Sequence, residues 1–263
     1  MYNFKFAGVA LSELHGVVTS RPDREVALYD GSLSDIPGRS KSEFIDNKRY
    51  KNVPFSREIG FSQRPSIQIP DLIEQLINWL GYHQNGYYEF EDSDHPGMVT
   101  YATLTNFGQI QTTLRRFHTA TLKFSRDPFW YIKKSLEYTS LDLTADTVSA
   151  TILNPYKIDS KPIIRFGLKN KSAGTDIIAF NIINGGVSTN YSYSLNRATY
   201  HGSYTLEIDC ENETVRLISG NTVHFRDSSI PKGFDIGSTT FTLTGSTKSN
   251  LNSLSFAPRW RCL

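Results

Sequence analysis

The stretch ATLKFSRDPFWYIKKSLEY occupies residues 120–138 and divides the sequence into two parts of different character. From Ala120 to Phe124, apolar and polar residues alternate, which is typical of a strand with one buried face. The aromatic cluster PFWY follows at residues 128–131, and two lysines come shortly after it. The residues before this stretch include a helical pattern. Those after it contain only short strand patterns and turn signals, so we predict a boundary between two domains here.

The length of 263 residues is sufficient for two ordinary domains, each large enough to bury its own core. We predict a mainly β chain in which a first domain with one helix occupies residues 1–134 and a second, a β-sandwich, occupies residues 135–263. Cys210 and Cys262 are too few for a disulfide framework. We expect two free buried thiols, as in a protein that folds in a reducing cytoplasm, with a single bridge as the alternative.

The charges are nearly balanced, with 28 basic and 26 acidic side chains. A dedicated nucleic-acid-binding protein would carry a field of positive charge, so this balance argues against that class. The 16 phenylalanines and 14 tyrosines suit strands and protein–protein surfaces. No apolar run approaches the ~18 residues of a membrane-spanning helix, and the first residues lack a signal-peptide pattern. We therefore expect neither membrane insertion nor a secretory leader.

Residues 69–82, IPDLIEQLINWLGY, carry the clearest helical pattern. We expect a helix over residues 70–81, with Asp71 as its N-cap, Glu74 completing a capping box and Gly81 ending it. Apolar residues recur at helical spacing and form one stripe that should lie on a sheet of the first domain. The core-facing side chains of this predicted helix include Leu72, Leu76, Trp79 and Leu80.

The second half alternates in a way that indicates antiparallel strands. Between Tyr204 and Cys210, apolar side chains alternate with polar ones. Short runs of this kind, separated by turn residues and without a helix, are typical of a β-sandwich. We expect Glu207, Asp209 and Glu211 to lie on an outward, solvated sheet edge.

Residues 39–64 hold seven basic side chains against three acidic ones. One interpretation is a solvated loop or hairpin face. The sharper interpretation is an arm that reaches a neighbouring subunit. The candidate interface residues are Arg39, Lys41, Lys48, Arg49, Lys51 and Arg57.

The acidic turn at residues 89–95 is the strongest enzyme-like candidate. Glu89 and Glu91 could act as acid and base in glycoside cleavage if they stood ~5–9 Å apart. Consecutive carboxylates after a strand more often form a solvated turn, and the spacing of a calcium-binding loop is missing. No zinc-ligand pair of histidines, nucleophile elbow, P-loop or dinucleotide fingerprint occurs. We therefore expect no enzyme, cofactor or metal, and favour a binding or structural role.

A carbohydrate-binding sandwich is the alternative function that the residues leave open. Tyr191, Tyr193 and Tyr200 could stack on sugar rings, and Arg197 and Asn190 could donate hydrogen bonds to hydroxyls. Exposed aromatic residues of an edge strand would explain the same pattern.

Several short pieces occur in an order that resembles the distal tail proteins (Dit family) of long-tailed bacteriophages with non-contractile tails. The resemblance extends over most of the chain, although each piece alone is unspecific. Two places depart from the family pattern: residues 125–127 lack the usual cysteine and second aromatic residue, and residues 237–239 lack a Gly-x-Asn pair. The matching pieces are IPGR at 36–39, an aromatic strand around 50–53, the helix with Trp79 and Leu80, the group Phe124, Pro128, Phe129 and Tyr131, KPII at 161–164, TLEID at 205–209 and FAPRWR at 256–261.

The resemblance implies a structural protein of the virion, located at the tail tip or baseplate after synthesis in the host bacterial cytoplasm. Its first domain would close a homohexameric ring around the DNA channel, and its second, galectin-like domain would project outward without an inserted carbohydrate-binding module. The ring would join the tail tube protein to the tail-tip protein and serve as the hub for receptor-binding proteins during host adsorption. DNA would pass without specific binding, which suits a nearly neutral chain.

Ring closure requires a heterologous interface, in which one patch meets a different patch on the neighbour. The basic stretch at residues 39–64 is our candidate for one side, and the acidic turn at 89–94 is a weaker candidate for the other. We also predict a cluster that packs at the seam between the domains. If RWR at residues 259–261 returns to this seam, the domains do not divide cleanly in sequence. The predicted seam residues are Phe124, Pro128, Phe129, Trp130 and Tyr131.

Overall fold

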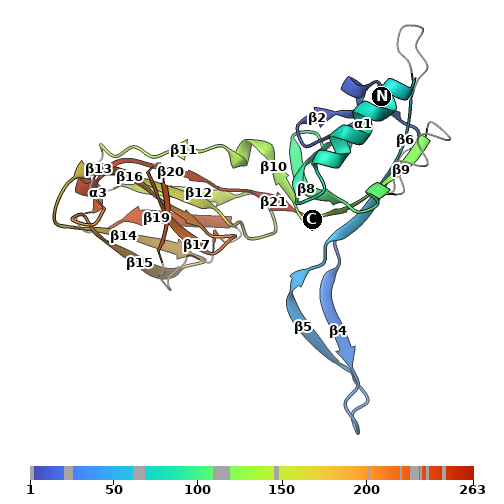
Figure 1. The fold of residues 1–263 in the computed structure, drawn as a ribbon. Helices are drawn as coiled ribbons and strands as arrows, with labels where there is room; N and C mark the ends of the chain where they lie inside the picture. Colours follow the sequence, from blue (N-terminus) through green and yellow to red (C-terminus); the bar gives the residue numbers. More distant parts are fainter. Residues whose placement is uncertain are drawn as a thin grey trace. The chain divides into compact units, whose positions relative to one another are not determined.

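The protein consists of two compact units, one of Met1–Trp130 with Leu263 and one of Tyr131–Cys262. Strands dominate both units, so the predicted mainly β fold is confirmed (Figure 1). Each unit is described by itself. The computed structural model describes residues 3–20, 26–61, 69–108, 119–144, 148–200, 202–219, 221–225, 231, 233–234, 237–244 and 247–263.

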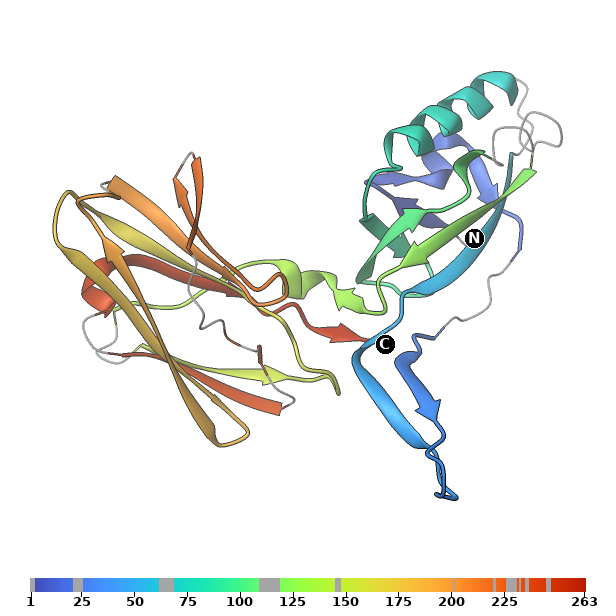
Figure 2. The ribbon, with the colours of Figure 1, turned by 60° about the horizontal axis from the view of Figure 1, so that its bottom comes forward.

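A curved antiparallel sheet forms the body of the first unit (Figures 1 and 2). Its strands follow the order β2-β1-β7-β8-β9-β6-β3. The 3-10 helix η1 (Leu11–Leu14) connects β2 to β3. The strand bounds are β1 (Phe4–Phe6), β2 (Val9–Ala10), β3 (Gly16–Val18), β6 (Val53–Phe61), β7 (Tyr88–Asp92), β8 (Met98–Leu104) and β9 (Thr119–Arg126).

Five phenylalanines from four strands form the centre of this unit. Their ring centroids lie 4.9 to 6.3 Å apart, the range of favourable stacked and edge-to-face contacts. The alternation in each strand places these rings on one face of the sheet, where all five are buried. The five residues are Phe4, Phe6, Phe55, Phe90 and Phe124.

The predicted helix is present as α1 (Ile69–Tyr82) and covers one face of the sheet (Figure 1). Leu72, Leu76, Trp79 and Leu80 are buried, and the Trp79 ring meets Phe6 edge-on at 5.9 Å. The helix begins at Ile69, so the side chains predicted to cap it lie inside the first turns. Its end at Tyr82 likewise falls one residue beyond the predicted glycine stop.

The second unit is a sandwich of two antiparallel sheets. One has the order β11-β20-β13-β16-β17-β18, and the other has the order β12-β19-β14-β15. A short helix, α3 (Thr247–Asn250), precedes β20, and the 3-10 helix η2 (Lys133–Leu136) follows the connecting strand β10 (Trp130–Ile132). The remaining bounds are β11 (Thr139–Ser140), β12 (Ser149–Asn154), β13 (Ile163–Lys171), β14 (Thr175–Asn184), β15 (Val187–Asn196), β16 (Gly202–Asp209), β17 (Thr214–Ser219), β18 (Asn221–Phe225), β19 (Gly237–Leu243), β20 (Leu251–Ala257) and β21 (Arg261–Cys262).

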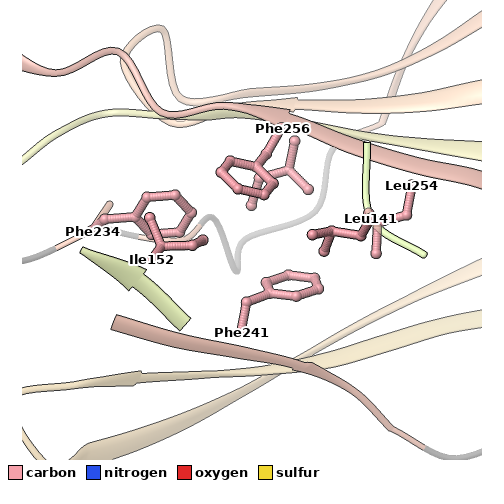
Figure 3. A pocket seen from close by; sticks show the side chains of 7 residues that line it. Leu141, Ile152, Phe234, Phe241, Leu254 and Phe256 are labelled. Atoms are coloured by element: carbon pink, nitrogen blue, oxygen red, sulfur yellow. The ribbon is translucent and has the colours of Figure 1, made fainter. Parts of the chain in front are cut away.

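Apolar side chains from both sheets meet in the sandwich core (Figure 3). A gap of about 180 Å³ lies among seven of them, and it is too narrow to admit a water molecule. All of its lining side chains are hydrocarbon, so the gap is a packing feature of the core. The lining residues are Leu141, Ile152, Ile164, Phe234, Phe241, Leu254 and Phe256.

The predicted solvated edge at Glu207 and Asp209 is wrong. Strand β16 lies inside its sheet, and both carboxylates are buried. Arg165 and Arg216 stand directly opposite Glu207 on the two neighbouring strands. The Arg165 Nε donates to Glu207 Oε2 at 2.7 Å, and Arg216 donates to Oε1. These long cationic side chains cover the carboxylate, an arrangement that alternation within one strand cannot reveal.

The end of the chain packs against the beginning of the second unit. The Ile132 amide donates to the Trp260 carbonyl at 2.9 Å, and the Arg259 amide donates to the Ser135 carbonyl at 3.0 Å. Residues 259–261 belong to the second unit, and Leu263 alone groups with the first.

Cys210 and Cys262 form no disulfide, as expected, but they differ in burial. Burial raises the pKa of the Cys210 thiol to about 12, so this side chain stays neutral in the sandwich core. Cys262 is only half-buried, which departs from the prediction of two buried thiols.

Candidate functional site: the β4–β5 hairpin

Strands β4 (Tyr29–Ser34) and β5 (Glu43–Tyr50) form a two-stranded hairpin that projects from the body of the first unit (Figures 1 and 2). It is a separate sheet among the described residues. The pairing runs from Ser34 opposite Glu43 to Tyr29 opposite Tyr50, with one irregularity near the base. Two-stranded hairpins are marginally stable in water on their own, so this one needs further contacts.

The base of the hairpin is fixed by aromatic and ionic contacts. The Tyr29 and Tyr50 rings meet edge-on at 5.0 Å, and Tyr50 meets Phe129 at 5.5 Å. Asp30 is buried here, and its carboxylate accepts a 2.7 Å hydrogen bond from Arg49 Nε. Lys51 lies 3.4 Å from the same carboxylate. The hydrogen bond from Arg49 lowers the pKa of Asp30, so this carboxylate remains ionised at neutral pH.

The outer part of the hairpin exposes large apolar side chains. Leu33 is 73% exposed, and Phe44 and Ile45 are about half exposed. Leu33 stands directly opposite Phe44, whose ring also covers Gly31, where a β-carbon would lie 2.1 Å from the ring. Ile45 lies on the other face because strand residues alternate. Both faces of the hairpin therefore present apolar area to solvent, which is typical of a surface that another chain covers.

The structure places the predicted interface residues in two different environments. Arg39, Lys41, Lys48, Arg49 and Lys51 belong to the hairpin or its immediate end, and all five are exposed. Lys48 has a left-handed backbone, φ 54°, at the irregularity in the pairing.

Arg57 does not belong with the other five. It lies on β6, where alternate residues face the interior, and it is buried against Asp92 of β7 with an Nη2–Oδ2 distance of 2.7 Å. Its guanidinium also lies over the Phe55 ring at 4.7 Å. Its prediction as an interface residue is wrong because β6 belongs to the packed sheet and Asp92 supplies a buried counter-charge.

The predicted seam residues do not form one cluster either. Phe124 belongs to the phenylalanine core of the first unit, and Phe129 contacts the base of the hairpin. Trp130 stacks on the His95 ring at 4.1 Å, and the guanidinium of Arg126 lies 5.3 Å from the centre of the Trp130 ring. Pro128 is half-buried in the same loop, and its carbonyl accepts a hydrogen bond from Arg126.

Tyr131 is the first residue of the second unit. It is buried there, and its hydroxyl donates to Glu211 at 2.9 Å.

Glu89, Glu91 and Asp92 of the predicted acidic turn lie on strand β7. Glu89 is exposed, Glu91 lies 4.0 Å from the amine of Lys5, and Asp92 is bound to Arg57. Within the part of the chain that the structure describes, no group of His, Cys, Asp and Glu side chains could hold a metal ion. No helix of those residues is long and apolar enough to cross a membrane.

The residues predicted for carbohydrate binding do not share one surface, since Asn190 is exposed whereas Tyr193 and Arg197 are buried. Tyr193 is buried in the sandwich core, and Tyr191 faces the same core, with its ring 5.3 Å from Phe180. Arg197 is completely buried and donates to the carbonyl oxygens of Lys169 and Gly202. Because the period of a strand is two residues, Tyr191 and Tyr193 share the inward face of β15.

The comparisons with known proteins identify a solved structure with a similar fold. The chain is similar over its whole length to the SPP1 Dit (gp 19.1) protein, at a TM-score of 0.61 and 15% identity, with all of both chains covered. That protein is described as a paradigm of the hub adsorption apparatus in phages that infect Gram-positive hosts. The chain therefore has the fold of a Dit protein.

A second solved structure, the phage P2 baseplate in its activated conformation with Ca, is 11% identical over 97% of both chains at a TM-score of 0.48, a likeness too weak to argue from. No protein-family model matches the sequence, and a search of curated proteins finds no match.

Proposed function

We propose that this chain is a distal tail protein of a long-tailed phage. About six copies form a ring at the tail tip, join the tail tube to the tail-tip protein and provide the hub to which receptor-binding proteins attach. In this proposal the first unit, Met1–Trp130 with Leu263, serves as the ring-forming domain expected for residues 1–134. The second unit, Tyr131–Cys262, serves as the galectin-like domain expected for residues 135–263. The whole-length similarity to the SPP1 Dit fold supports this role.

The observation that carries the ring proposal is the exposed hairpin. Leu33, Phe44 and Ile45 leave apolar area in water that a second copy would cover. The basic residues around them favour an acidic surface on the neighbour, and the turn at residues 89–94 presents exposed Glu89 and half-buried Asp94. A hairpin of one copy that meets a different surface of the next is a heterologous contact, and repetition of this contact closes a ring.

The test is the oligomeric state of the full chain, measured by sedimentation velocity and light scattering over a wide concentration range. We expect a closed ring of about six copies. The double variant Leu33→Ser/Phe44→Ser should sediment as a folded monomer, because it removes apolar contact area without touching the core. Tyr82→Ser is the matched control: Tyr82 is 81% exposed at the end of α1, away from the hairpin, and its loss should leave the ring intact.

Two results would contradict the proposal. One is a wild-type monomer at every concentration that also fails to assemble when a tail tube protein is added. The other is a double variant that forms the same ring as the wild type, which would remove the hairpin from the interface.

A further inference from the structure

The four-stranded sheet of the sandwich has almost no charge. Across β12, β19, β14 and β15 the single charged residue is Asp176, which is buried. The outward positions of these strands are serines, threonines, asparagines and a few apolar residues such as Leu153 and Ile177. Protein surfaces commonly hold about a quarter or more charged residues. An uncharged face of this size favours a neutral partner.

Strand β15 is an edge of this sheet, and its sequence VSTNYSYSLN does nothing to protect it. It pairs with β14 over all ten residues without a bulge, and the described residues place no strand on its other side. Natural edge strands are usually interrupted by a lysine, a proline or a bulge, because an open ladder pairs with other chains. Strand β15 has none of these.

The hydrogen bonds that flank β15 define which backbone groups face the open edge. The Arg197 amide donates to the Gly174 carbonyl at 2.9 Å and continues the β14–β15 ladder by one pair. Because bonded pairs alternate in an antiparallel ladder, the odd-numbered residues of β15 bond to β14. The even-numbered residues therefore direct their N–H and C=O groups outward. These residues are Ser188, Asn190, Ser192 and Ser194, with the Asn196 carbonyl already used by Tyr200.

The side chains on the two faces of β15 indicate which residues an added strand would need. Its outward side chains are small and polar, from Ser188 to Ser194. On the inward side, Val187 is 69% exposed and Tyr191 half-buried, so the sandwich core does not fully cover this end of the strand. A strand placed beside β15 would gain most with apolar residues on the inward side, small polar residues on the other, and no charge.

We propose that the edge of β15 receives an extended, uncharged segment of a partner polypeptide by strand addition. This inference rests on the proposed ring function for its choice of partner. Antiparallel pairing of β15 with β15 of a second copy needs a two-fold axis, and in a ring of six the two-fold rotation relates only opposite copies, which the central channel keeps apart. Each copy in one ring therefore keeps this edge open to another protein, as a hub requires.

The probe is a fluorescent ten-residue peptide with the β15 sequence itself, which is uncharged and alternates as required. Fluorescence anisotropy with the full chain should show saturable binding. Ser192→Pro should weaken that binding at least about tenfold, because it removes an edge donor and obstructs the incoming strand while leaving the β14 ladder intact. Ser192→Ala is the matched control and should change the affinity less than about twofold, since it removes the hydroxyl alone. A scrambled peptide of the same composition should not bind.

A second arm keeps the test valid if Ser192→Pro fails to fold. The β15 peptide N-methylated on consecutive residues cannot pair along either edge, and it should not bind the wild-type chain. The Leu33→Ser/Phe44→Ser hairpin variant should bind the unmodified peptide normally, so a failed ring and a failed strand addition give different results.

Three outcomes would overturn the inference. The first is no peptide binding, or equal binding by the methylated peptide. The second is a change in the oligomeric state of Ser192→Pro relative to Ser192→Ala, which would assign the edge to a second copy. The third is binding of a soluble neutral polysaccharide in place of the peptide, which would assign the uncharged face to a glycan.

Discussion

Strands β5 and β6 follow one another within the basic stretch at residues 39–64, yet their environments are opposite. All eight residues of β5 except Tyr50 are exposed, whereas alternate residues of β6 are buried. Arg49 of β5 is 74% exposed as a side chain, and Arg57 of β6 is 7% exposed. The difference lies in the neighbouring strands. Strand β6 is flanked by β9 and β3, whereas β5 pairs with β4 alone among the described residues.

The comparison shows that a run of basic residues does not define a surface. Burial of Arg57 requires Asp92 from a strand 35 residues away in sequence. At the base of the hairpin, Arg49 of β5 and Lys51 just after it meet Asp30, and both side chains remain mostly exposed. A charged side chain is therefore buried and stabilises the fold where the sheet places an opposite charge beside it. Where no opposite charge lies beside it, the side chain stays exposed and is available for contact with another subunit.

Among variants of β5 and β6, the largest loss of stability should follow removal of one partner of the Arg57–Asp92 pair. Arg57→Ala or Asp92→Ala leaves the other charge buried and should lower the free energy of unfolding by about 3–5 kcal/mol. Urea denaturation of the purified chain measures this loss. The double variant Arg57→Met/Asp92→Leu should lose much less, since both charges leave together and hydrocarbon fills the space. A small loss in both single variants would contradict the structural role of Arg57.

Replacement of Arg49 at the base of the hairpin should have a smaller effect, which appears in the pKa of Asp30. The pKa of Asp30 is lowered in the folded state, so its contribution to stability is present above the unfolded value of about 3.9 and is lost as pH falls through the lowered folded value. Arg49→Ala should raise the Asp30 pKa toward that ordinary value. An NMR titration of the Asp30 carboxyl measures the shift, with Arg39→Ala as the control in the same hairpin. An unchanged Asp30 pKa in Arg49→Ala would refute this account.

The smallest change in the free energy of unfolding is expected for substitution of Lys48. Its backbone is left-handed at φ 54°, a conformation that glycine adopts without strain. Lys48→Gly should therefore change the unfolding free energy by less than about 1 kcal/mol, in the stabilising direction, because relief of strain exceeds the added freedom of the unfolded chain. Hydrogen exchange of the β5 amides would detect the change locally. Faster exchange in the variant would show that Lys48 contributes contacts that the folded hairpin needs.

Local patterns in the sequence determined the helix at residues 69–82, the strands with alternating apolar residues and the mainly β class. These patterns depend on periodicity and turn chemistry, which act between residues close in sequence. The order of short matching pieces also indicated a Dit-like fold. The Arg165–Glu207–Arg216 row could not be found in this way, because it joins three strands whose register is set only when the sheet forms.

The tertiary structure alone decided which polar and aromatic residues face solvent. Arg57, Glu207 and Arg197 are buried where counter-charges or carbonyl groups from other strands contact them, and Tyr193 is buried where the two sheets meet. The same assembly of strands left the β4–β5 hairpin and the β15 edge uncovered. Burial of a charge and openness of an edge both depend on contacts between residues far apart in the chain, and a single sequence does not specify those contacts by its local pattern.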